Sequence, residues 1–136
     1  MSVHSPMLAP PRRSVGERAR EIVRLNGFTS IVWALMMFAI VVPLADRVGM
    51  TRIGSALLGG AILLVGGGEV LLSEGRRLRR THVIPFALLN AACASGCVVL
   101  LTGSNLLWTP ARVVVAAAAV TFAWFAGTES RAARSL

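Results

Sequence analysis

Four long apolar segments restrict this chain to a small number of folds. They occupy residues 27–44, 53–72, 83–102 and 108–127. A helix rises about 1.5 Å per residue, so segments of about 18 to 20 residues reach roughly 27–30 Å, the thickness of the hydrocarbon core of a bilayer. Their apolar residues do not alternate with polar ones, and an open sheet could not satisfy its edge in lipid. The sequence therefore predicts an all-α integral membrane protein, with a bundle of four transmembrane helices over residues 27–127.

The charge of the chain favours a lipid surface as its partner over nucleic acid. The 136 residues carry a formal net charge of +8, yet only 15% of them are charged and 55% are hydrophobic. In a soluble protein such a basic balance would suggest nucleic-acid binding. Here the arginines flank apolar segments, where they can interact with anionic lipid headgroups. We expect the lipid bilayer as the partner, with anionic headgroups at the arginine-rich face, and no nucleic acid.

The distribution of arginine predicts the orientation in the membrane. Eleven of the fourteen basic residues lie before the first segment, between the second and third, or after the fourth. Since cytoplasmic loops are enriched in Lys and Arg, both termini are expected in the cytoplasm. Each half of the chain then forms an in-out-in helical hairpin, and beyond this outline the two halves show no residue-level repeat. All basic residues are Arg, with abundant Ala, Gly and Val, so we expect a bacterial inner-membrane protein from a GC-rich genome.

The ends of the chain are more polar than its middle. Residues 1–13 are Pro-rich and aperiodic, which predicts a disordered lead. Residues 14–26 predict a short amphipathic helix in the membrane interface, begun by a capping box of Ser14 and Glu17. The alternative is a solvated extension of the first transmembrane helix. Residues 128–136 are expected to form a cytoplasmic tail.

Small residues recur at helical spacing in the second and fourth segments. Glycines repeat every seven residues in the second segment, and small residues recur every four in the fourth, at Ala119, Ala123 and Gly127. In lipid, such residues let helices approach closely, and close packing drives helix association. We therefore expect the second and fourth helices to contribute smooth faces, either to each other or to a second copy in a homo-oligomer or larger complex. The predicted helix-packing residues are Gly59, Gly60, Gly66, Gly67, Ala119 and Ala123.

Glu69 is the one acidic residue inside an apolar segment. A carboxyl group in a membrane can carry a proton or bind a cation, so it is a functional candidate. The alternative, which the shallow depth of Glu69 in its segment favours, is that Glu69 reaches the interface and forms an ion pair with Arg76, Arg77 or an arginine of the N-terminal lead. Asn90, in the third segment, is the second candidate: it can line a transport path or form a hydrogen bond to a neighbouring helix.

Cys93 and Cys97 share one face of the third segment with Asn90. Two thiols could form part of a Cu(I) path together with Met36 and Met37. Cysteine also packs as a small hydrophobic residue, and we favour that interpretation, with no metal and no cofactor.

Two functions remain open at this stage. The chain contains no set of residues typical of catalysis, so an enzyme is not expected. The favoured hypothesis is an accessory, assembly or structural subunit that acts through helix packing. The alternative is an oligomeric transporter that uses Glu69, either for small molecules or coupled to protons or cations.

Overall fold

The computed structural model describes residues 14–75, 78–103 and 109–136 and consists of helices. No strand occurs in these ranges. A π-helical turn at Met37–Val41 follows the first long helix, and a 3-10 turn at Ala45–Val48 precedes the second. The four long helices are α1 (Val15–Met36), α2 (Arg52–Glu74), α3 (Arg80–Gly103) and α4 (Thr109–Ser135).

All four long helices are long and apolar enough to cross a membrane. They correspond in order to the four predicted segments, so the expected all-helical class with four candidate spans is confirmed. Many of their large apolar side chains point outward, such as Leu57, Leu64 and Val120, which are about 70–80% exposed. In water such a surface would be strongly unfavourable, whereas in a bilayer it contacts lipid. The chain is therefore a small multi-pass membrane protein.

Helix α1 extends through the segment expected to lie in the interface. Its first turn carries the predicted capping box: the Ser14 amide donates to Glu17 Oε2 at 2.7 Å, and the Glu17 amide donates to Ser14 Oγ at 3.2 Å. From there the helix is continuous to Met36. A separate interfacial helix is not confirmed, because no break separates residues 14–26 from the first span. The predicted disordered lead, residues 1–13, lies outside the described residues.

Helix α4 extends beyond the predicted end of the fourth span at Gly127. It continues to Ser135, so most of the residues assigned to a tail are helical. The buried face of α4 also continues into this part, through Glu129, Ala132 and Ala133. Packing of this face explains why the helix does not end at residue 127.

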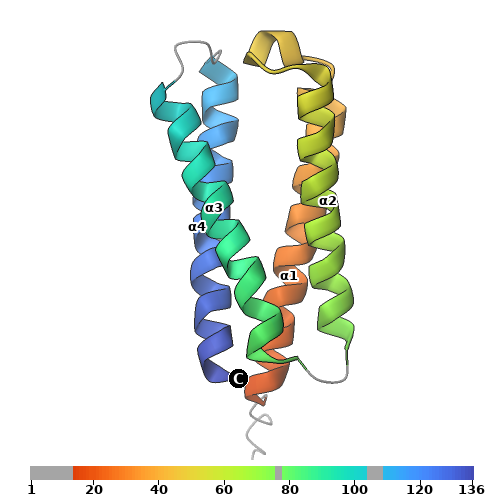
Figure 1. The fold of residues 1–136 in the computed structure, drawn as a ribbon, viewed down its shortest axis with the longest axis vertical. Helices are drawn as coiled ribbons and strands as arrows, with labels where there is room; N and C mark the ends of the chain where they lie inside the picture. Colours follow the sequence, from red (N-terminus) through yellow and green to blue (C-terminus); the bar gives the residue numbers. More distant parts are fainter. Residues whose placement is uncertain (1–13, 76–77, 104–108) are drawn as a thin grey trace, which may run out of the picture.

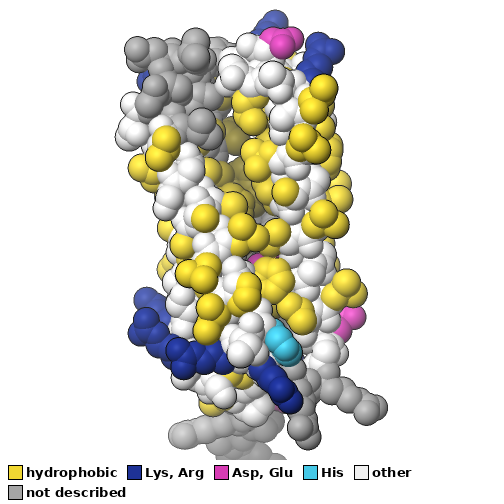
Figure 2. All heavy atoms as spheres, viewed as in Figure 1, with side chains coloured by type: hydrophobic (Ala, Val, Ile, Leu, Met, Phe, Trp, Pro, Cys, Tyr) yellow, Lys and Arg dark blue, Asp and Glu magenta, His cyan; other side chains and the backbone are white. Residues whose placement is uncertain are grey.

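The helices pack in two pairs (Figure 1). Helix α1 lies against α2, and α3 lies against α4, while the main contact between the pairs is made by α1 and α4. Few residues of α2 contact α3. In Figure 2 apolar side chains cover the middle of the visible face, and arginine side chains gather toward the ends of the bundle. Each pair is closely packed, and the two pairs meet over a smaller surface.

The α1–α2 contact depends on two glycines. A Cβ atom added to Gly27 would lie 2.7 Å from the carbonyl oxygen of Gly66, and one added to Gly66 would lie 2.7 Å from that of Gly27. One heptad earlier in α2, Gly59 faces Met37 and Phe38 of the π-helical turn. The absence of side chains lets the two backbones meet, as close packing in lipid requires.

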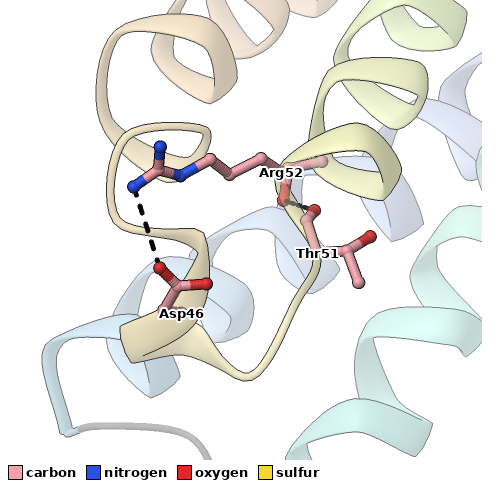
Figure 3. A network of polar contacts seen from close by, with 4 residues as sticks. Asp46, Thr51 and Arg52 are labelled. Carbon is pink, nitrogen blue, oxygen red and sulfur yellow. Dashed lines mark hydrogen bonds and ion pairs between the residues drawn. The ribbon is translucent and has the colours of Figure 1, made fainter.

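The turn between α1 and α2 is held by short-range polar contacts (Figure 3). Arg52 forms an exposed ion pair of 3.8 Å with Asp46. Thr51 Oγ1 accepts a hydrogen bond of 3.0 Å from the amide of Gly54. Gly49 ends the 3-10 turn with a φ of 73°, a conformation that glycine adopts without steric cost. The N-cap Thr51 then starts α2.

Candidate functional site

Each of the four long helices contributes one buried polar side chain to a single cluster. None of these four residues is more than 2% exposed, and both acids are 0% exposed. Burying a carboxyl group in an apolar environment is costly unless it is hydrogen-bonded, paired or neutralised. This four-residue polar cluster consists of Asn26 of α1, Glu69 of α2, Asn90 of α3 and Glu129 of α4.

Helical periodicity brings the four side chains inward. Each lies three or four residues from other buried residues of its own helix, so it continues a face that already points into the bundle. The buried series are Val23, Asn26 and Ser30 in α1; Gly66, Glu69 and Ser73 in α2; Val83, Ala87 and Asn90 in α3; and Phe122, Phe125 and Glu129 in α4.

Glu129 has a donor for each of its carboxyl oxygens. Asn26 Nδ2 donates to Oε1 at 2.9 Å, and Asn90 Nδ2 donates to Oε2 at 3.0 Å. Both bonds join different helices, α1 to α4 and α3 to α4. Amide donors stabilise an ionised carboxylate, so the charged form is more favourable for Glu129 than for Glu69.

Glu69 has fewer donors. Asn90 Nδ2 also contacts Glu69 Oε1, but at 3.5 Å, the limit of a hydrogen bond. Glu69 Oε2 has no hydrogen-bond partner among the described residues. Glu69 Oε1 and Glu129 Oε2 share the Asn90 Nδ2 donor, so the two carboxyl groups are neighbours, and Glu129 offers only acceptor oxygens while it is ionised. A proton on Glu69 would supply the missing donor.

The two acids therefore form a pair suited to hold one proton. Two carboxyl groups that share a site repel each other strongly when both are ionised, and burial makes this repulsion more costly. The amides that hydrogen-bond to these acids come from Asn26 and Asn90. The hydrogen bonding of the two acids and the two amides is most complete when one acid is protonated and the other is ionised.

The structure brings together the two candidates that the sequence identified, Glu69 and Asn90. Glu69 is fully buried, and its Oε1 contacts Asn90 of α3. Two of the arginines proposed as its interfacial partners, Arg76 and Arg77, lie outside the described residues. Depth within the segment had suggested a position near the interface, but the rotation of α2 about its axis directs the side chain inward.

Sequence reasoning missed the other two members of the cluster. Asn26 was included in the interfacial segment, and Glu129 was included in the tail. A signal for Glu129 existed: it follows the aromatic residues Phe122 and Phe125 at spacings of seven and four, and so continues their face of α4.

The cluster reveals a short repeat that the sequence analysis did not find. The expectation of no residue-level repeat needs correction. Leu-Asn-small occurs at residues 25–27 and 89–91, and Gly-x-Glu occurs at residues 67–69 and 127–129. Each half of the chain contributes an asparagine from its first helix and a glutamate from its second. The repeat is hard to see in the sequence because only these few positions share it.

The predicted packing residues have different surroundings. Gly66 faces α1 and Gly59 faces the π-helical turn that follows α1, and neither faces α4 as one of the expected arrangements had it. Gly60 and Gly67 would meet nothing within 4 Å if a Cβ were added. In α4, Ala119 is buried and Ala123 is exposed. The two glycine series of α2 are offset by one residue and have different surroundings. Gly59 and Gly66 pack within the chain, whereas Gly60 and Gly67 border open space.

The thiols lie away from the acids along α3. Cys93 and Cys97 are half-buried, about one and two turns beyond Asn90. Within residues 14–75, 78–103 and 109–136, no group of three or more His, Cys, Asp or Glu side chains could hold a metal ion.

Comparison with known proteins provides no relative from which to transfer a function. No protein-family model matches the chain, and no match was found among curated proteins or solved structures.

Proposed function

We propose that this protein is a small, non-enzymatic, proton-coupled membrane transporter in which Glu69 and Glu129 form the coupling site. The observation that carries the proposal is the incomplete hydrogen bonding of Glu69: it is fully buried, yet its Oε2 has no donor among the described residues. Ionisable residues inside a membrane are costly and commonly mark ion or proton pathways.

The chemistry of the site explains how a proton can be coupled to a solute. With one proton, the pair has a single negative charge, which the amides of Asn26 and Asn90 support. Loss of that proton leaves two buried carboxylates, a state that needs a compensating cation. A cationic solute or a monovalent cation is the species whose binding would release the proton. The proton and the cation then compete for the same pair of acids, and this competition couples the movement of one to the movement of the other.

The two-pair architecture supports a movement around this site. Helices α1 and α2 pack closely, as do α3 and α4, whereas the surface between the pairs is smaller. Transporters with parallel repeats work by moving one repeat against the other around a fixed site. Asn90 bonds the glutamate of its own half, but Asn26 bonds the glutamate of the other half. Transfer of both asparagine donors from Glu129 to Glu69 would produce the equivalent arrangement with the two halves exchanged, and would define a second state.

An accessory or structural subunit is the second candidate. One observation favours it: the cluster takes one side chain from each helix, so it can hold the two pairs together without transporting anything. Interhelical hydrogen bonds stabilise membrane bundles modestly, by about 0.6–2 kcal/mol each. In that case neutral substitution of Glu69 would change stability at most.

We further propose the orientation and assembly that the sequence predicts. The start of α1 and the end of α4 lie at the same end of the bundle, and both carry arginine (Figure 1). This favours cytoplasmic termini in a bacterial plasma membrane. Gly60 and Gly67 border open space, so a second copy of the chain can pack there.

The test is proton flux in liposomes containing the purified protein. A pH-sensitive dye inside the vesicles would report proton movement when a gradient of a candidate cation is imposed. We expect Glu69→Gln and Glu129→Gln to abolish coupled flux while leaving the protein folded. Glu74→Gln is the matched control, because Glu74 is exposed at the end of the same helix as Glu69.

The outcomes separate the two candidates. Loss of flux in both cluster variants, with flux retained in Glu74→Gln, supports transport. If wild type and variants show no flux with any of a panel of inorganic and organic cations, and the cluster variants only change thermal stability, the transporter is rejected in favour of the structural subunit.

A further inference from the structure

A second feature lies at the end of the bundle where α1 begins and α4 ends. A hollow of about 810 Å³ opens between these two helices. Its walls include Val15, Arg18 and Ile22 from α1, and Thr128, Arg131 and Ala132 from α4. The hollow is separate from the acid pair, since neither Glu69 nor Glu129 lines it.

The chemistry of these walls combines positive charge with apolar surface. Each helix contributes one arginine, and both arginines are exposed. Guanidinium groups bind phosphate oxygens in a bidentate manner, and no acidic residue lines the hollow. Val15, Ile22 and Ala132 provide the apolar part of the wall. A ligand that suits this surface has a phosphate at one end and a hydrocarbon portion beside it.

The position of the hollow favours a membrane lipid over a soluble anion. It lies at the ends of two membrane-spanning helices, where headgroups meet the hydrocarbon region. Basic pockets between transmembrane helices on the cytoplasmic side are sites for acidic phospholipid headgroups. We propose that an anionic phospholipid binds here, with its phosphate between Arg18 and Arg131 and its first acyl carbons against the apolar walls.

The chain offers an internal comparison for this site. A second basic hollow lies between α3 and α4 at the same end of the bundle, lined by Arg80 and Arg134, but its volume is only about 160 Å³. It has similar charge without comparable space. Specific lipid binding should therefore depend on the two arginines of the larger hollow, whereas general attraction to anionic membranes should depend on the arginines of both hollows.

Native mass spectrometry of the full chain can test this with defined lipids. The purified protein would be titrated with phosphatidylglycerol and, separately, with phosphatidylcholine of the same acyl chains. We expect wild type to bind phosphatidylglycerol preferentially, and the double variant Arg18→Gln with Arg131→Gln to lose about tenfold of that preference. The control, Arg80→Gln with Arg134→Gln, removes the same charge from the smaller hollow and should keep the preference within about twofold.

Measurement of the melting temperature with and without lipid distinguishes a loss of lipid binding from a folding defect. Lipid bound to the native state raises its melting temperature, so phosphatidylglycerol should stabilise wild type and the control but not the single variants Arg18→Gln and Arg131→Gln. Equal losses of preference in the two double variants would overturn the proposal in favour of nonspecific attraction. Equal binding of the two lipids by wild type, or undiminished binding when inorganic phosphate replaces the lipid, would also overturn it.

Discussion

Asn26 of α1 donates a hydrogen bond of 2.9 Å to Glu129 of α4, a residue 103 positions later in the chain. The bond joins the first long helix to the last and crosses between the two helix pairs. With the bond from Asn90, it gives Glu129 two amide donors. Glu69 is left with one long contact, from Asn90. This asymmetry favours Glu129 as the ionised acid of the pair and Glu69 as the protonated one.

Infrared spectroscopy should detect a protonated carboxyl group in the purified protein at neutral pH. We expect the carbonyl band of a carboxylic acid in wild type, because two buried carboxylates in one site repel each other. The band should disappear in Glu69→Gln, where Glu129 keeps both amide donors and can remain ionised. Glu74→Gln should retain the band, since Glu74 is exposed. A spectrum without any protonated carboxyl in wild type would contradict the shared-proton arrangement.

Removal of the Asn90 amide should destabilise the bundle. Asn90→Ala deprives both acids of a donor, and a buried polar group left unsatisfied costs about 1–3 kcal/mol. The free energy of unfolding in detergent, from a denaturant titration, would measure the loss. Ser95→Ala is the control on the same helix, because Ser95 is exposed and bonds only its own helix backbone at Ala91. Equal losses in the two variants would show that the amide does not support the acids.

Two neighbouring glycines of α2 should respond oppositely to alanine. In Gly66→Ala the new Cβ would lie 2.7 Å from the Gly27 carbonyl oxygen, so α1 and α2 must separate. We expect a loss of about 1–3 kcal/mol in the free energy of unfolding, as for other overpacked sites. In Gly67→Ala nothing lies within 4 Å, and the better helix propensity of alanine should stabilise the helix slightly. The prediction fails if Gly66→Ala is as stable as wild type.

Cysteine labelling should place the two ends of the bundle on opposite sides of the membrane. In a variant with Cys93 and Cys97 replaced by alanine, single cysteines at Asp46 and Ser135 would be exposed to a membrane-impermeant maleimide. We expect Ser135→Cys to react from the cytoplasmic side and Asp46→Cys from the opposite side, following the arginine distribution. A third variant, Arg79→Cys, should behave like Ser135→Cys. Labelling of Asp46→Cys and Ser135→Cys from the same side would refute this topology.

The sequence predicted the helices better than their ends. Hydrophobicity over about 20 residues identifies a span, so all four helices were expected in the right order. It does not locate the last turns, where packing decides whether the helix continues. The buried face of α4 carries Glu129 and Ala132 past the predicted end at Gly127, and α1 begins at Val15 without a separate interfacial segment.

What the sequence by itself determined is the membrane class of this protein: length, apolar character and arginine position allow helices across a bilayer and little else. Their polar side chains within apolar segments also identified Glu69 and Asn90 as candidates. Only the tertiary structure decided that they meet, that Asn26 and Glu129 join them, and that Gly66 rather than Gly67 faces α1. The physical reason is that periodicity defines which residues share a face of one helix, whereas the rotation of each helix against its neighbours depends on how all four pack together.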